Sequence, residues 1–276
     1  MSRSGKLGLA ICALMALVVV LGPVVAPHDP TAVDGVPLSP PGDGYLLGTD
    51  ALGRDLFSRV LAGGRSVLLL AAVATALTYL MAVPLGLLGA TLRGPAEGLL
   101  MRSLDVLLAF PALLLLLIFA ATRGPGATTV VVAVAITQVP GLARIVRAAA
   151  LEVSVKPYVD AARVRGERAG AVMFGEILPN VRTTLLTDAG MRLTLSILLI
   201  SAANYLGLGV RPPQPDWGLM VAENQDGLAL QPLAVLVPAL MIALLTVGIN
   251  LVADAFGDVD GALAAEESAV RPQEGS

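Results

Sequence analysis

The sequence predicts an all-α membrane protein with six transmembrane helices, and three observations support this fold class. Hydrophobic residues make up 56% of the 276 residues, charged residues make up 14%, and the mean hydropathy is +0.81. Soluble domains are roughly half apolar and about a quarter charged. The chain also contains six long runs without a charged residue, and its basic residues are concentrated in alternate connecting segments. Lipid is therefore expected to be the solvent for much of the chain.

Each uncharged run is long enough to cross a bilayer. A run of about 20 apolar residues spans a hydrocarbon core of about 30 Å as a helix, and a charged side chain at mid-helix costs about 2.5–3.5 kcal/mol on insertion. The turn Gly124-Pro125-Gly126 predicts a hairpin between two antiparallel helices. The runs are 7–28, 66–92, 106–122, 124–143, 193–210 and 227–253.

The first run has two interpretations. Arg3 and Lys6 precede it and Val24-Val25-Ala26 resembles a cleavage site, which is the pattern of a secretory signal peptide. The run is longer than a typical signal core, however, and Pro27 would follow the cleaved bond. We expect an uncleaved anchor, with cleavage as the alternative.

The basic residues predict the orientation of the chain. If the N-terminus is cytoplasmic, 13 of the 18 Lys and Arg residues lie in cytoplasmic segments and five lie outside. Cytoplasmic loops of membrane proteins carry the excess of Lys and Arg. Both termini are therefore expected in the cytoplasm.

The external segment 29–65 is rich in Pro and Gly up to Gly48 and then changes character. Apolar residues at spacings of three and four predict a short amphipathic helix over 49–61, capped by Thr49 and lying on the outer membrane surface. These apolar residues are Leu52, Leu56, Phe57, Val60 and Leu61. The alternative is that this helix merely covers the ends of the spans.

The cytoplasmic segment 144–192 is longer than a connection between bundle helices needs to be, and it holds eight of the 18 basic residues. Pro157 suits the first turn of a helix that Gly166 interrupts. A second helix is predicted from Ala169 until Pro179 breaks it. The two helices could form a protruding knob that receives another protein, or a hairpin held to anionic lipid by its charge.

The residue inventory argues against catalysis in this chain. One histidine and one cysteine exclude multi-histidine zinc sites and internal disulfides. Neither Lys6 nor Lys156 belongs to a phosphate-binding loop, and no G-x-S-x-G elbow is present. A net charge of −3 gives no bulk basic surface for nucleic acid. A transporter, a channel or a structural subunit remains, without a metal or cofactor of its own.

A few polar or amphipathic residues lie in or near the spans. Asn204 and Asn250 are expected to form hydrogen bonds between helices, and Trp217 is typical of an anchor at the outer interface. The Ala- and Glu-rich tail after Asp260 is expected to be disordered.

The segment around Gly166 resembles the hallmark loop of the permease subunits of binding-protein-dependent ABC importers. That loop reads E-A-A, three residues, Gly, nine residues, I-x-L-P, and here Asp160-Ala161-Ala162, Gly166 and Leu178-Pro179 stand in the same register. Two positions depart from it: Asp160 replaces Glu, and Glu176 replaces Ile.

Further motifs resemble the dipeptide/oligopeptide C-type subgroup of these permeases. They include a G-T-D-x-x-G-R-D-x-x-S-R signature over 48–59 and a Y-L-G-L-G-V-x-P-P sequence over 205–213. The resemblance extends from about residue 45 to residue 258.

The resemblance implies a type I ABC importer transmembrane domain in a bacterial inner membrane. It implies an anchor and external loop over 1–65, a permease domain over 66–255 whose coupling loop is 144–192, and a tail over 256–276. The implied partners are a second homologous permease, two cytoplasmic ATPase subunits that use ATP and Mg²⁺, an extracytoplasmic substrate-binding protein and membrane lipid. The residues implied to couple this chain to the ATPases are Asp160, Ala161, Ala162, Gly166, Leu178 and Pro179. Cargoes in the subgroup are dipeptides, longer peptides, nickel chelates and glutathione.

Two other functions stay open from the residues alone. An ATP-independent secondary transporter would need ionisable residues within its spans and inverted repeats, and these spans are nearly free of charge. A membrane scaffold subunit would use the cytoplasmic knob only to recruit a partner.

Overall fold

A computed structural model describes residues 3–92 and 94–270 of the chain. Over these residues the structure is helical, with two isolated β-bridges between residues 42 and 55. The helices are α1 (Arg3–Val25), α2 (Leu56–Thr91), α3 (Pro95–Leu108), α4 (Ala112–Arg123), α5 (Ala127–Ser154), α6 (Pro157–Val164), α7 (Ala169–Val172), the π-helix η1 (Met173–Ile177), α8 (Leu178–Tyr205), α9 (Trp217–Asn224), the 3₁₀-helix η2 (Gln225–Gly227) and α10 (Leu233–Val270).

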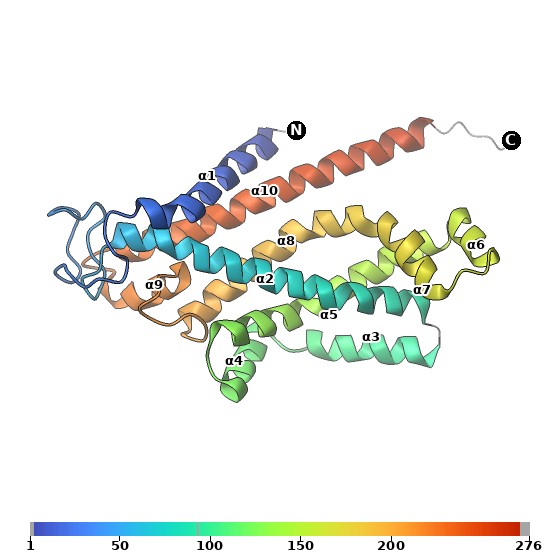
Figure 1. Ribbon diagram of the computed structural model, residues 1–276, viewed down its shortest axis with the longest axis horizontal. Coiled ribbons are helices and arrows are strands. Elements are labelled where there is room, and N and C mark those ends of the chain that lie inside the picture. The colour runs from blue at the N-terminus through green and yellow to red at the C-terminus, as the bar shows by residue number, and fades with distance from the viewer. Residues whose placement is uncertain (1–2, 93, 271–276) are drawn as a thin grey trace.

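The long helices lie side by side along the molecule (Figure 1). At one end, here called the loop end, the segment 26–55 lies beside α9. The opposite end carries α6 and α7 and is called the α6 end. Helix α1 packs along α10 at one edge, while α2, α5 and α8 form the centre. The N-terminus of α1 and the C-terminus of α10 both point away from the loop end.

Five helices of the described chain are long and apolar enough to cross a membrane, and a bent pair brings the number to six. The prediction of a single helix over 106–122 is wrong, because this run falls on the end of α3 and on α4, which meet at an angle of 87°. Pro111 directly precedes α4, and a proline restrains the residue before it from continuing a helix. The predicted turn at 124–126 is confirmed, since it joins α4 to α5.

The separate amphipathic helix predicted over 49–61 is also wrong. Residues from Leu56 onward belong to the first turns of the 36-residue helix α2. Asp55 rather than Thr49 caps this helix, since its carboxylate accepts hydrogen bonds from the backbone N and hydroxyl of Ser58. Thr49 lies in the loop instead, where its hydroxyl donates to the carbonyl of Val36. Of the predicted apolar residues, Leu56, Val60 and Leu61 are buried within the protein, whereas Leu52 is exposed.

Pro179 does not end a helix, contrary to the prediction. Helix runs without a break from Ala169 to Tyr205, and the turn before the proline widens into the π-helix η1. There the N–H of Leu178 bonds to the carbonyl of Met173, five residues back. The wider turn accommodates a residue that has no N–H and whose ring would collide with the preceding turn of an α-helix. The side chain of Asn180 donates to the carbonyl of Glu176 at 2.6 Å.

Two apolar clusters make up the core, one toward each end. Trp217 is fully buried in the cluster of the loop end, and its indole N–H donates to the carbonyl of Val60 at 2.8 Å. The prediction of an interfacial anchor at Trp217 is therefore wrong. An apolar ring of this size contributes most when it is wholly buried and its N–H has an acceptor.

The two intramembrane asparagines differ. Asn250 accepts a hydrogen bond from the hydroxyl of Thr194 on α8, which confirms an interhelical bond. Asn204 instead accepts from the backbone N–H of Val210, in the turn that follows its own helix. At the C-terminus α10 extends to Val270, which differs from the expected disorder, and residues 271–276 lie outside the described chain.

Candidate functional site

The residues singled out by sequence lie in the α6 segment, residues 155–179, at the α6 end of the molecule. Pro157 stands in the first turn of α6, where its missing N–H is not needed. The helix ends before Gly166, whose φ of +83° is a left-handed conformation that glycine adopts without strain. Gly166 thus reverses the chain between α6 and α7. The predicted two-helix arrangement around this glycine is present.

The faces of α6 separate the predicted residues into two groups. Asp160, Ala161 and Gly166 are exposed. Ala162 is fully buried beside Val159 and packs into the core cluster of the α6 end. Residues three apart share a face of a helix, so Ala162 holds α6 to the bundle while its neighbours face outward. Val164 adds an apolar side chain that is 89% exposed.

Leu178 and Pro179 stand farther along the same segment. Leu178 is half-buried against the core cluster of the α6 end, and Pro179 is exposed at the start of α8. Helix α6 itself packs on α7 and η1. The π-helix η1 therefore connects the predicted residues of α6 with Leu178 and Pro179. It leads directly into α8, which runs the length of the molecule.

Exposed ion pairs lie on the surface of the α6 segment. Arg163 bonds to the carboxylate of Asp160 at 2.8 Å and to the carbonyl of Ser154 at 3.2 Å. Arg165 pairs with Glu167 at 2.7 Å and reaches Glu176 of η1 at 3.8 Å. Exposed pairs of this kind contribute at most about 1 kcal/mol each because water and salt screen them. Because these ion pairs are weak, their side chains can rearrange when a partner binds.

A cavity of about 650 Å³ lies between the α6 segment and the adjoining ends of α2, α3 and α5. Arg147 on α5 lines it, pairs with Glu97 on α3 and donates to the carbonyl of Gly89 on α2 at 3.2 Å. These contacts fasten three helix ends to one another directly beneath α6. Nothing in the sequence pattern indicated this cavity.

Helices α2 and α8 are also linked by side chains between the two ends. The hydroxyl of Tyr79 on α2 donates to the carbonyl of Leu185 at 2.8 Å and to the carboxylate of Asp188 at 3.1 Å. Farther along, the hydroxyls of Thr75 and Ser196 bond at 2.8 Å. Polar side chains within a bilayer typically bond across helices in this way.

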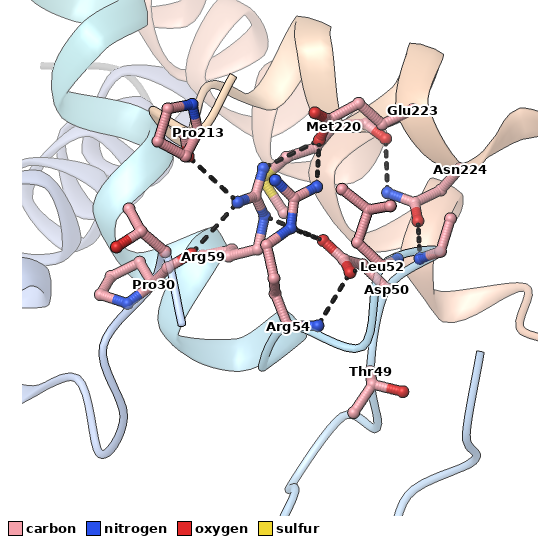
Figure 2. Close-up of polar contacts among 12 residues, drawn as sticks. Pro30, Thr49, Asp50, Leu52, Arg54, Arg59, Pro213, Met220, Glu223 and Asn224 are labelled. Atoms are coloured by element: carbon pink, nitrogen blue, oxygen red, sulfur yellow. Dashed lines mark hydrogen bonds and ion pairs between the residues drawn. The ribbon is translucent and has the colours of Figure 1, made fainter. Parts of the chain in front are cut away.

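At the loop end, four charged side chains form a closed ring of alternating sign (Figure 2). The carboxylate of Asp50 contacts Nε of Arg54 at 2.6 Å and Nε of Arg59 at 3.2 Å. The carboxylate of Glu223 contacts Nη2 of the same two arginines at 2.7 and 2.9 Å. Arg59 is fully buried, and the Glu223 side chain is only 14% exposed. We call Asp50, Arg54, Arg59 and Glu223 the charge ring.

Further contacts join the charge ring to its surroundings. Arg59 donates to the carbonyls of Pro30 and Pro213, and Asn224 accepts from the backbone N–H of Ala51 at 2.8 Å (Figure 2). Sequence reasoning had placed Arg54 and Arg59 in an amphipathic helix and had no signal for Glu223. A pairing between residues 164 positions apart leaves no local pattern.

The sequence is similar to those of known proteins. Residues 82–259 match the family model described as "Binding-protein-dependent transport system inner membrane component". A di/tripeptide transport system permease protein, DppC of Pseudomonas aeruginosa, is 37% identical over 91% of this chain and 85% of its own length. A glutathione transport system permease protein, GsiD of Pectobacterium atrosepticum, is 36% identical over 79% of this chain and 72% of its own length.

A solved structure shares the fold at much lower identity. A chain of the MetNI methionine ABC transporter in an inward-facing conformation superposes with a TM-score of 0.55 at 16% identity, covering 70% of this chain and 94% of its own. This chain therefore shares its arrangement of helices with a chain of that transporter. The chain belongs to the family of binding-protein-dependent transport system inner membrane components.

Proposed function

We propose that this chain is one of two permease subunits that together form the pathway of a peptide importer. The relatives reported above are permeases of di/tripeptide and glutathione transport systems, and a probable D,D-dipeptide permease, DdpC of Escherichia coli, is 35% identical over 90% of this chain and 84% of its own length. All three names specify a peptide as the cargo. The second permease is a homologous chain, and an extracytoplasmic binding protein delivers the cargo.

The α6 segment is the contact with a cytoplasmic ATPase subunit. One observation carries this assignment: the exposed face of α6 is linked through α7 and η1 to a helix that continues unbroken to Tyr205. A movement imposed at Asp160, Ala161 or Gly166 is thereby conveyed along α8. The buried Ala162 packs α6 onto the helix bundle. Leu178 and Pro179 lie where η1 passes into α8.

The chemistry of ATP belongs to the partner chains. The sequence carries no phosphate-binding loop. Two ATPase subunits with ATP and Mg²⁺ supply the free energy, and this chain acts as a transport subunit and not as an enzyme.

The orientation follows from six crossings and the distribution of basic residues. The loop end faces the extracytoplasmic side of a bacterial inner membrane, the α6 end faces the cytoplasm, and both termini are cytoplasmic. The excess of Lys and Arg in the cytoplasmic segments supports this assignment.

A transport assay on the purified complex in lipid vesicles tests the function. Peptide uptake that requires hydrolysable ATP and a loaded binding protein, and that persists when ion gradients are dissipated, is the expected result. Uptake that runs on an ion gradient without ATP would instead establish a secondary transporter. A complex that captures its partners but moves no cargo would establish a scaffold. Dipeptides, tripeptides, glutathione and nickel chelates offered in parallel identify the cargo.

Docking of the α6 segment is tested by cross-linking. Cysteine placed at Ala161, in a chain whose Cys12 is replaced by serine, is expected to capture an ATPase subunit. Cysteine at the buried Ala162 serves as the matched control, since it is one residue away and faces the bundle. Equal capture from both positions, or from neither, contradicts the assignment.

A further inference from the structure

The charge ring joins three parts of the chain that are distant in sequence. Asp50 and Arg54 belong to the segment 26–55, Arg59 to the first turn of α2, and Glu223 to the last turn of α9. The ring therefore fastens the end of α2 to α9 at the loop end (Figure 2).

Helix α9 is in turn fixed to α8. Gly218 of α9 lies against the backbone of Ser201 on α8, so closely that an added Cβ would come within 2.4 Å of the Ser201 carbonyl oxygen. The turn between the two helices is closed by the bond from the N–H of Val210 to the side chain of Asn204. A displacement of the outer end of α8 therefore displaces α9 as well.

The physical character of the ring suits it to fixing geometry. Buried ion pairs contribute little net stability, because desolvation offsets their attraction, but removal of one partner leaves a buried charge uncompensated. In a closed ring each carboxylate contacts two arginines and each arginine contacts two carboxylates. No member can move apart from the others without breaking two contacts.

We propose that the charge ring is a transmission contact, which makes the outer end of α2 follow α8 and α9 when the α6 segment is moved. Glu223 and Arg59 are its positioning residues, because within the ring only their contact joins α9 to α2 directly. The path runs from α6 through α7, η1, α8 and α9 to the ring and then to α2. This inference rests on the proposed function.

The first test measures cargo moved per ATP hydrolysed by the reconstituted complex. Glu223→Gln keeps the size of the side chain and removes its charge, and we expect this ratio to fall about tenfold, within the range of coupling between distant sites. Asp226→Asn removes the same charge three residues away, from an exposed position for which no ion pair is found among the described residues. The control is expected to keep the wild-type ratio. An unchanged ratio in Glu223→Gln overturns the proposal.

A double variant separates transmission from folding. Arg59→Gln together with Glu223→Gln removes one charge of each sign, so that Asp50 and Arg54 remain as a neutral pair. We expect the thermal stability of the double variant to return toward wild type while the transport ratio stays low. Recovery of the ratio together with stability would show a merely structural role and would overturn the proposal.

A distance measurement tests the linkage without reference to cargo. Spin labels at the exposed Arg65 of α2 and Leu228 after η2, in a chain with Cys12 replaced, report whether α2 and the α9 region move together. In the wild-type complex we expect one narrow distance that is the same with and without ATP, and in Glu223→Gln a distance that broadens or shifts. A complex that fails to transport any peptide refutes the proposed function, whereas equal distance distributions in both proteins refute the transmission role alone.

Discussion

The indole N–H of Trp217 on α9 donates a hydrogen bond to the carbonyl oxygen of Val60 on α2, with 2.8 Å between the two heavy atoms. The bond lies inside the apolar cluster of the loop end, and Val60 directly follows Arg59 of the charge ring. Gly64 on α2 faces the indole ring of Trp217, and an added Cβ at Gly64 would come within 2.4 Å of that ring. Trp217 therefore fills a space that the glycine leaves open.

Trp217→Ala should lower the free energy of unfolding by about 3–5 kcal/mol, because it removes a large buried ring and leaves a cavity. Trp217→Phe should cost clearly less, since most of the ring volume remains and the Val60 carbonyl still bonds within its own helix. Thermal unfolding of the detergent-solubilised protein measures both. Equal destabilisation by the two substitutions would contradict the packing role.

Asp216 predicts a pH dependence of stability. Burial raises the pKa of its carboxyl above the ordinary 3.8, against smaller opposing effects that include the hydrogen bonds from the backbone N–H groups of Leu219 and Gly218. The folded protein therefore binds more protons than the unfolded chain between pH 3.8 and the raised pKa, and its stability falls as the pH rises through that interval.

Asp216→Asn should remove this contribution while it keeps the cap of α9, because asparagine is as good a capping residue as aspartate. Melting temperatures measured from acidic to neutral pH should decline less steeply in the variant than in wild type. Parallel curves for the two proteins would show that Asp216 is not the group responsible.

Gly166 allows a test of the reversal between α6 and α7. Val and Asn are of similar size, but Asn tolerates a positive φ far better than a β-branched residue does. Gly166→Val should therefore reduce uptake per ATP strongly while the complex still assembles, and Gly166→Asn should keep most of it. Peptide uptake into vesicles and ATP hydrolysis are measured on the same preparations of both variants. Equal losses in the two variants would contradict a requirement for a positive φ at residue 166.

Pro179→Ala should convert η1 toward an ordinary α-helix, because alanine restores the N–H that the proline lacks. An α-turn in place of a π-turn rotates the preceding residues by about 100° relative to α8. Hydrogen exchange over residues 173–178 should slow, and capture of the ATPase from position 161 should weaken. Pro157→Ala, in the first turn of α6, is the matched control and should change neither quantity; unchanged exchange in Pro179→Ala would contradict the explanation of η1.

Local signals were sufficient for much of the fold. Uncharged runs located the spans, Gly124-Pro125-Gly126 located a turn, and Gly166 located the break between α6 and α7. Tertiary packing decides the effect of a proline: Pro111 stands at the 87° bend between α3 and α4, whereas Pro179, which was predicted to end a helix, only widens a turn. Propensity gives the tendency of a residue, and the neighbouring helices decide the outcome.

The candidate site was predicted as a set of residues but not as a surface. The register of Asp160, Ala161 and Ala162 is visible in the sequence, yet only the packed structure shows that Ala162 points inward. Glu223 was missed altogether, since its partners lie more than 160 positions away. Contacts at such separations are set by the fold, and a single sequence carries no mark of them.

The family match begins at residue 82, yet Glu223, Asn224 and Gln231, all inside it, bond to groups between residues 39 and 59. A shortened chain that kept only the matched region would strand a carboxylate and two amide side chains without their acceptors and donors. Residues 39–59 are therefore an integral part of the permease structure. A truncation made for expression or crystallisation must leave them in place.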